Sequence, residues 1–170
     1  MKDAPKRMLI ELPAADEIDD LAITTPKFEV RKFEFDRADT KADLRYPPCK
    51  AQAVMVVSGS RGTVLAKGAD GRWAVPSGRV GAAEEIPVGV KRIAKDDFGL
   101  SLRSMELAGI YDVIWHYSDM TVKRLHFVYA AVTDDEPDPK VKERVRNFQK
   151  PEESVKDDIS KAAIADCREK

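Results

Sequence analysis

The stretch from Trp73 to Leu100 decides the fold, and it reads WAVPSGRVGAAEEIPVGVKRIAKDDFGL. Its pattern predicts a short strand, a loop around Pro-Ser-Gly, and a helix with Pro87 in its first turn. Asp96 and Asp97 stand side by side near the end of that helix. Carboxylate oxygens close to loop carbonyl oxygens are the hard ligands that suit Mg²⁺ or Mn²⁺. The stretch therefore indicates a metal site that would bind a diphosphate.

The spacing within this stretch is similar to that of the Nudix box, G-x5-E-x7-R-E-U-x-E-E-x-G-U, where U is a bulky aliphatic residue. The residues on its fixed positions are Gly78, Glu84, Arg92, Gly99 and Leu100. The chain thus resembles the Nudix hydrolases. The resemblance implies an α+β fold, an α/β/α sandwich with a mixed sheet. It also implies metal-dependent hydrolysis of a nucleoside diphosphate that is linked to another group.

Some residues depart from the box. Ile93 stands where the family has a glutamate, Ser77 replaces the first glycine, and Asp96 and Asp97 replace two glutamates. A Nudix subgroup, the GDP-mannose mannosyl hydrolases, also has an aliphatic residue after the arginine and the pattern Trp-x-Val-Pro-x-Gly-Arg-Val. This further resemblance implies that the substrate is a nucleotide sugar and that water attacks the sugar carbon.

The subgroup also implies roles for individual residues. The metal would be held by Asp97 and the carbonyl oxygen of Ser77, with Asp96 beside them. Arg79 would neutralise the diphosphate, which suits a bidentate guanidinium. Gly78 would allow a sharp turn and a close approach of the backbone to the phosphates. The alternative is that Asp96 and Asp97 are only an exposed helix end.

The remaining box residues are expected to hold the loop. Glu84 either braces the loop by hydrogen bonds or adds a carboxylate to the metal site, and bracing is favoured. Arg92 pairs with Glu84 or with Asp96, which lies four residues further along the helix. Trp73 either packs in the core or stacks on a nucleobase.

A general base is harder to assign. The mannosyl hydrolases carry a Gln-His pair just before the last strand, but the corresponding segment here, residues 140–148, contains no histidine. Glu143 in that segment is the candidate base, and the alternative is a solvated surface acid. His126 lies inside a predicted strand and is expected to be structural, whereas His116 lies at a strand end. Either histidine serves as a base only if the fold places it near the metal.

Composition bounds the class of protein. A chain of 170 residues with 43% hydrophobic residues suits one globular domain with an extension. Its 29 basic and 30 acidic residues give no basic field for nucleic acid. No apolar run suits a membrane span or a signal peptide, and Cys49 and Cys167 show no metal or disulfide spacing. We therefore expect a cytoplasmic protein with two reduced thiols. The Nudix resemblance, and not the composition, implies a nucleotide-type small-molecule substrate.

Residues 1–50 are predicted to be an extension, and residues 51–170 the Nudix domain. In the extension we expect a helix over 16–23, a strand over 27–36 with a bulge near Arg31-Lys32, and a connection over 39–50. The strand would join either the sheet of the domain or that of a partner subunit. In the second case the protein would be a homodimer. In the domain we expect strands over 51–58, 63–67, 73–75, 104–117 and 123–133, and a final helix over 151–167.

Two functions are compatible with these patterns. The first is a Nudix hydrolase that acts on a nucleotide sugar. The second is a catalytically impaired Nudix-fold module that binds a nucleotide or a partner protein. The full spacing of the box and its mannosyl-hydrolase-like variant support the first, which is the function we expect. Ile93, the shortened acids and the missing base support the second, which stays the alternative.

Overall fold

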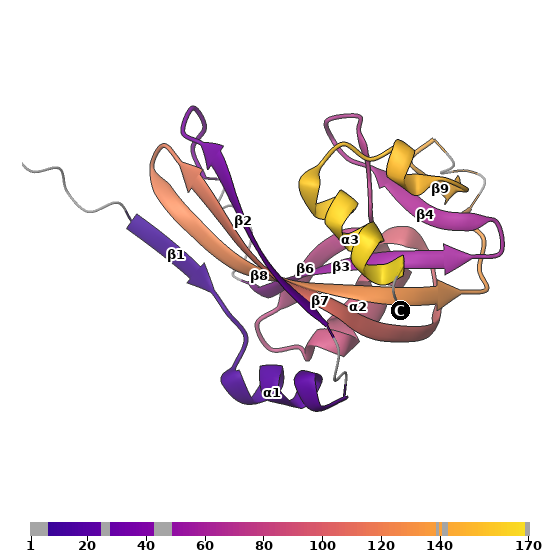
Figure 1. Ribbon diagram of the computed structural model, residues 1–170, viewed down its shortest axis with the longest axis horizontal. Helices are drawn as coiled ribbons and strands as arrows, with labels where there is room; N and C mark the ends of the chain where they lie inside the picture. Colours follow the sequence, from indigo (N-terminus) through magenta and orange to yellow (C-terminus); the bar gives the residue numbers. More distant parts are fainter. Residues whose placement is uncertain (1–6, 25–27, 43–48, 139, 141–142, 169–170) are drawn as a thin grey trace, which may run out of the picture.

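The computed structural model describes residues 7–24, 28–42, 49–138, 140 and 143–168. Within these residues nine strands form one mixed sheet, with helices on both of its faces (Figure 1). The strands are β1 (Arg7–Glu11), β2 (Glu29–Arg37), β3 (Cys49–Gly59), β4 (Gly62–Lys67), β5 (Trp73–Ala74), β6 (Ser77–Gly81), β7 (Leu102–Tyr117), β8 (Met120–Thr133) and β9 (Val145–Phe148). The helices are α1 (Ala15–Thr24), α2 (Ile86–Phe98) and α3 (Asp158–Arg168), with a 3-10 turn η2 (Pro151–Glu153). The predicted α+β class with a mixed sheet is confirmed.

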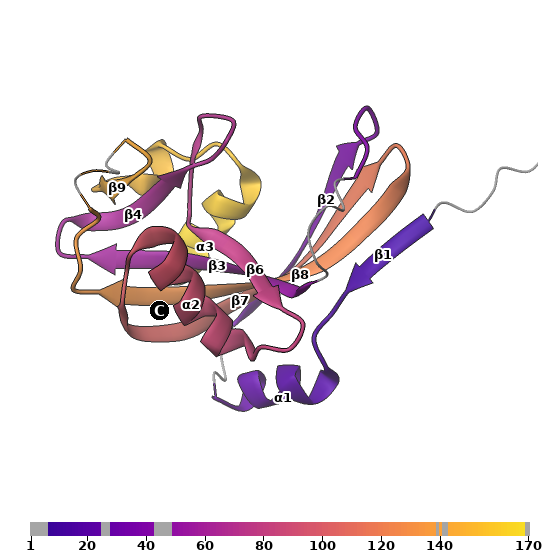
Figure 2. The same ribbon diagram turned by 180° about the vertical axis from the view of Figure 1, so that it is seen from behind.

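The centre of the sheet is formed by β3 and β8, which pair in parallel. The apolar, β-branched run in β3 suits a strand buried on both faces. Helix α2 covers one face, where its Val90 and Ile93 join the larger hydrophobic cluster. Helix α3 covers the other face with Ala163 and Ile164 (Figures 1 and 2). The molecule is therefore a sandwich with the sheet as its middle layer.

Helix α2 has clear start and stop signals. Pro87 lies in its first turn, where the missing N–H costs nothing. Gly99 ends the helix in the left-handed conformation, with φ of 70°. The N–H of Leu100 then donates to Ala94 O at 2.9 Å, and the Leu100 side chain is buried, as is common at such an end. This end leaves Asp96 and Asp97 exposed in the last turn.

The extension joins the same sheet. Helix α1 and strand β2 lie close to their predicted positions, and β2 runs parallel to β7 without a register shift, so the bulge expected at Arg31-Lys32 is wrong. The change in phase of the apolar residues along this segment has another cause, which is that they pack on opposite faces of the sheet. Phe28 packs with the cluster under α2, whereas Phe33 and Phe35 pack on the α3 side. Val30 is 73% exposed and takes no part in either core.

Other elements differ from their predicted limits. Strand β1 was not predicted, and it pairs in parallel with the start of β8. The loop expected at 76–78 continues into strand β6, and strand β9 pairs with β4. The last helix begins at Asp158 rather than Pro151, since Pro151 starts a 3-10 turn and Val155 forms a bridge with Trp73. The expected connection over 39–50 lies partly outside the described residues.

Both cysteines, Cys49 and Cys167, are free thiols. None of the helices in the described part of the chain has the length and apolar content that crossing a membrane requires.

Candidate active site

Strand β6 carries the start of the box and pairs antiparallel with β3, with Gly78 opposite Ala53 and Arg79 opposite Gln52. Successive side chains of a strand point to opposite faces. Val80 is buried in the cluster under α2, so Gly78 faces α2 as well. Arg79 therefore faces the α3 side of the sheet, as does Gln52. Gly78 and Arg79 thus lie on opposite faces of the sheet in strand β6, which runs beside α2 (Figure 2).

The loop between β6 and α2 is held by an ion pair. Arg92 donates from Nε to Glu84 Oε2 at 2.9 Å and from a terminal nitrogen to Glu84 Oε1 at 2.8 Å. Glu84 Oε1 also accepts the Gly81 N–H at 2.9 Å, and Arg92 donates to Arg79 O at 2.9 Å. The hydrogen bonds from Arg92 lower the pKa of Glu84, and Glu84 raises the pKa of Arg92. The expected brace is confirmed, with Glu84 rather than Asp96 as the partner of Arg92.

Ile93 occupies the inner side of this loop. Its side chain is 1% exposed, and a β-carbon placed on Gly78 would lie 2.8 Å from its Cγ2. The family's first helix carboxylate is thus replaced by an apolar group that packs under Gly78. The contact with Ile93 is by itself a reason for glycine at this position.

Asp97 faces a groove of about 350 Å³ between the end of α2 and strands β4 and β9. The groove is also lined by Lys67, Asp138 and Arg144. Both Asp138 and Arg144 precede β9 in the chain, and Arg144 belongs to the segment 140–148 in which the candidate base was sought. No spacing in the sequence links these residues to the box, because the sheet pairing of β4 with β9 brings them to it. The basic side chains around this groove suit a phosphate, and its acidic side chains suit a cation.

The donors fit a magnesium ion of the kind that keeps part of its water shell. Within the described residues, no three acidic, histidine or cysteine side chains cluster as an all-protein metal site requires. Mg²⁺ often needs less, since one or two carboxylates plus waters and substrate phosphates complete its octahedron. Asp96 and Asp97 are exposed to solvent and have hard oxygen donors. Their chemistry suits that requirement. Of the predicted donors, Asp97 lines the groove, whereas Ser77 begins strand β6 and Asp96 is not part of the groove lining.

Trp73 has contacts of its own. Its ring lies edge-on to Phe148 at 4.9 Å between centroids. Arg146 Cζ and Lys67 Nζ lie 4.8 and 5.1 Å from the Trp73 ring centroid. The structure therefore places Trp73 in an aromatic and cationic cluster on the α3 side.

The candidate bases lie in different surroundings. Glu143 is exposed and precedes Arg144, which lines the groove. His126 is buried against Trp115, and burial together with the charge of Arg124 lowers its pKa to about 3. His116 is half-exposed near the end of β7, 3.8 Å from Glu34. Of the three candidates, Glu143 thus adjoins a residue that lines the groove, and neither histidine lies in the groove lining.

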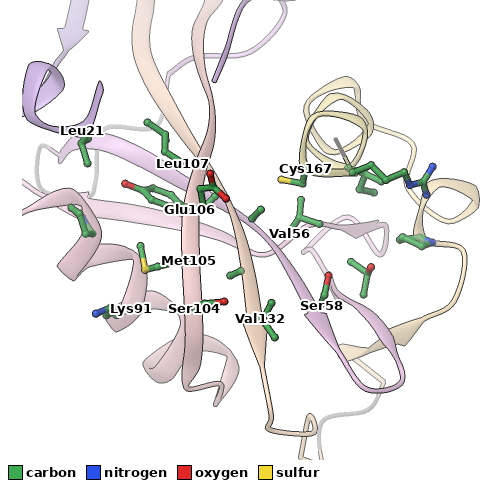
Figure 3. Close-up of a pocket in the computed structure, with 18 of the residues that line it drawn as sticks. Leu21, Val56, Ser58, Lys91, Ser104, Met105, Glu106, Leu107, Val132 and Cys167 are labelled. Carbon is green, nitrogen blue, oxygen red and sulfur yellow. The ribbon is translucent and has the colours of Figure 1, made fainter. Parts of the chain in front are cut away.

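A larger hollow of about 900 Å³ lies elsewhere. It follows the edge of β7 before β2 begins to pair with that strand, and it opens on both faces of the sheet. Figure 3 shows Met105 and Lys91 on one side of β7, and Val56 and Cys167 on the other. Its lining includes none of the box residues predicted to act on a diphosphate. We therefore place the candidate site at the box and not in this hollow.

Solved structures superpose on the sheet and its helices. The mutator protein MutT from Bacillus halodurans gives a TM-score of 0.54 at 19% identity, over 68% of this chain and 79% of that chain. The E. coli dihydroneopterin triphosphate pyrophosphohydrolase gives 0.50 at 13% identity, over 67% and 91%. The C. elegans Ap4A hydrolase gives 0.50 at 8% identity, over 70% and 96%. No protein-family model matches the chain, and no curated protein is significantly similar to it in sequence.

These superpositions define the class of fold. The chain has the fold of the Nudix hydrolases, which is the fold that the box in its sequence predicts.

Proposed function

We propose that the protein is a metal-dependent hydrolase of a nucleoside diphosphate linked to another group. The observation that carries this proposal is the pair of hydrogen bonds by which Arg92 joins Glu84 and the Arg79 carbonyl oxygen. They hold strand β6, which bears Ser77 and Arg79, against the helix that bears Asp97. A Nudix fold with this brace intact suits diphosphate chemistry. Nucleotide sugars are the substrate class that the mannosyl-hydrolase-like box favours.

In this proposal each residue has a defined task. Asp96, Asp97 and the Ser77 carbonyl oxygen hold Mg²⁺, which neutralises charge on the diphosphate when bound. Arg79 binds the diphosphate oxygens in a bidentate manner. Glu143 is the candidate that takes the proton of the attacking water.

The reaction proposed for a nucleotide sugar is a substitution. The oxygen of water forms a bond to the anomeric carbon, and the bond from that carbon to the diphosphate oxygen breaks. The products are the free sugar and a nucleoside diphosphate, and the proton lost by water passes to the base. Stabilising the charge of the leaving diphosphate is then the main task of Arg79.

A second function is favoured by one observation. Ile93 is buried where the family has a metal-binding carboxylate, so the chain has lost a ligand and cannot regain it by a rotamer change. A nucleotide-binding module without turnover is the function that this loss favours.

A panel of substrates separates the two functions. Nucleotide sugars, dinucleoside polyphosphates, ADP-ribose and nucleoside triphosphates are incubated with Mg²⁺ or Mn²⁺, and products are identified by chromatography. Metal-dependent release of a nucleoside diphosphate from a nucleotide sugar supports attack at carbon. Release of a nucleoside monophosphate and a sugar phosphate supports attack at phosphorus and rejects the mannosyl-hydrolase-like reaction. Absence of turnover across the panel, with nucleotide binding retained, supports the binding module.

A further inference from the structure

Strand β1 extends along the start of β8, away from α2 and α3 (Figures 1 and 2). Most of this strand is open to solvent, and Met8 and Ile10 are 60% and 52% exposed. Its last residue, Glu11, is different, because it is only 7% exposed. A buried carboxylate is costly unless it is paired and hydrogen-bonded. The partners of Glu11 therefore show what this strand is bound to.

Arg124, which lies opposite Glu11 on β8, is the first partner. It donates from Nε to Glu11 Oε2 at 2.9 Å and from a terminal nitrogen to Glu11 Oε1 at 2.7 Å. Its remaining nitrogen donates to Gln52 Oε1 at 3.3 Å, and its Cζ lies 5.9 Å from the Trp115 ring centroid. Burial alone would raise the pKa of Glu11, but these hydrogen bonds outweigh it and lower that pKa. The Arg124 guanidinium thus connects β1 to Gln52 on β3.

Cys49 is the second partner. Its Sγ donates to Glu11 Oε2 at 2.7 Å. Burial, with a further effect of the Glu11 hydrogen bond, raises the pKa of the Cys49 thiol to about 11, so the thiol keeps the proton that it donates. The charge of Arg79, which lies opposite Gln52 on β6, has the opposite effect and lowers the pKa of the same thiol. Glu11 is therefore connected to β3 at two residues, directly to Cys49 and through Arg124 to Gln52.

These two residues of β3 lie opposite strand β6, which carries the start of the box. On the neighbouring strand β6, Gln52 is opposite Arg79 and Cys49 is opposite Gly81. Gly81 is in turn the residue whose N–H binds Glu84. Glu11 therefore fixes, through β3, both ends of the three-residue segment that begins with Arg79. The Arg92 brace fixes the same segment from the side of α2.

We propose that Glu11 is a positioning residue, which holds the Arg79 side chain in the place where it meets the diphosphate. The role of Arg79 rests on the proposed function; its placement by Glu11 does not. An arginine that is ordered before binding loses less conformational entropy when it binds an anion. The N-terminal strand then contributes to the site indirectly, because a residue of the extension sets the position of a residue of the box.

The direct test observes Arg79 itself. The full chain is labelled with ¹⁵N, and the arginine Nε–Hε signals are recorded for the wild type, Glu11→Gln and Glu17→Gln. Arg79→Lys identifies the Arg79 signal by its loss. Glu17→Gln is the matched control, because Glu17 joins helix α1 to β3 through Lys50 and to α2 through the Ile86 N–H, each at 2.9 Å. We expect the Arg79 signal to shift or broaden in Glu11→Gln and to stay unchanged in Glu17→Gln.

An unchanged Arg79 signal in folded Glu11→Gln overturns the proposal. If that variant does not fold, Gln52→Met replaces it, since it removes the acceptor of Arg124 at similar side-chain length. The same shift is expected there, and its absence has the same meaning.

A binding measurement separates this proposal from the proposed function. The Kd of ADP and of GDP is measured by calorimetry with Mg²⁺. We expect both to bind about tenfold more weakly to Glu11→Gln, which corresponds to the loss of one well-placed charged hydrogen bond, and within about twofold of wild type to Glu17→Gln. An equal Kd for wild type and Glu11→Gln contradicts the proposal. If the wild type binds neither nucleotide, the proposed function fails, and the Arg79 signal alone decides whether Glu11 positions Arg79.

Discussion

The Ile93 side chain lies directly under Gly78, so close that a β-carbon on Gly78 would be 2.8 Å from Ile93 Cγ2 and 3.0 Å from Cγ1. This contact joins helix α2 to the strand that carries Arg79. The Nudix box has a carboxylate at the Ile93 position, where this chain has an apolar side chain. Here Gly78 instead packs against the apolar Ile93 side chain, and the Glu84–Arg92 pair holds the loop that follows β6.

Gly78→Ala should destabilise the protein by about 1–3 kcal/mol, because Ile93 is buried and branched and cannot move aside without strain. Urea unfolding at pH 7 measures the change. Gly59→Ala is the matched control, since the nearest atom to its new β-carbon would be at 3.6 Å, an ordinary contact.

The double variant Gly78→Ala with Ile93→Ala tests the cause. Removing the Ile93 side chain makes room for the new methyl group, so the combined cost should be smaller than the sum of the two single costs. Simple additivity would show that Ile93 is not what excludes a side chain at Gly78.

Asp166 joins helix α3 to the sheet and to the extension. It is 2% exposed and accepts hydrogen bonds from Tyr111 Oη at 2.5 Å and from Arg31 Nε at 2.8 Å. Asp166→Asn should cost about 3 kcal/mol of unfolding free energy, since the charge of Arg31 loses its partner and a buried network is broken. Asp158→Asn, on the exposed first turn of the same helix, should cost less than about 1 kcal/mol. Equal costs for the two variants would show that the network contributes little.

His126 should make stability depend on pH. Its pKa falls from 6.5 to about 3 on folding, because the site is buried and because Arg124 lies nearby. Between these two values the unfolded chain binds a proton that the folded chain does not, so stability falls as the pH falls below 6.5. The loss from this one group should be about 2 kcal/mol between pH 7 and pH 5.

Urea unfolding at several pH values measures this dependence. In His126→Phe the decline between pH 7 and pH 5 should become shallower by that amount. His116→Gln, at the half-exposed histidine, should keep the wild-type decline. The same decline in both variants would contradict a neutral His126.

The box allowed the fold and one local contact to be predicted from sequence. Its spacing predicts α2, the glycine end at Gly99 and the class of fold, because these depend on residues close together in the chain. The Glu84–Arg92 pair was predicted for the same reason, since both residues belong to one loop and helix. Strand β6 was missed because Pro76 and Gly78 usually break a strand, and here the backbone resumes pairing with β3 immediately afterwards.

The long-range parts of the candidate site could not be predicted. Glu11, Gln52 and Arg124 are brought together by the pairing of β1, β3 and β8, which no periodicity reveals. Asp138 and Arg144 reach Asp97 in the same way, through the pairing of β4 with β9. Charged residues of this kind read as solvated surface until the sheet order is known.

The most direct test of the account is the Mg²⁺-dependent hydrolysis of the best substrate from the panel by wild type, Asp97→Asn and Glu85→Gln. Glu85 is an exposed acid before the first turn of α2 and serves as the matched control. The account predicts that Asp97→Asn lowers kcat/KM by about 100-fold or more while the protein stays folded, and that Glu85→Gln remains within about twofold of wild type. Equal kcat/KM values for wild type and Asp97→Asn, or a wild type that hydrolyses nothing, would contradict the claim that this site is a metal-dependent hydrolase.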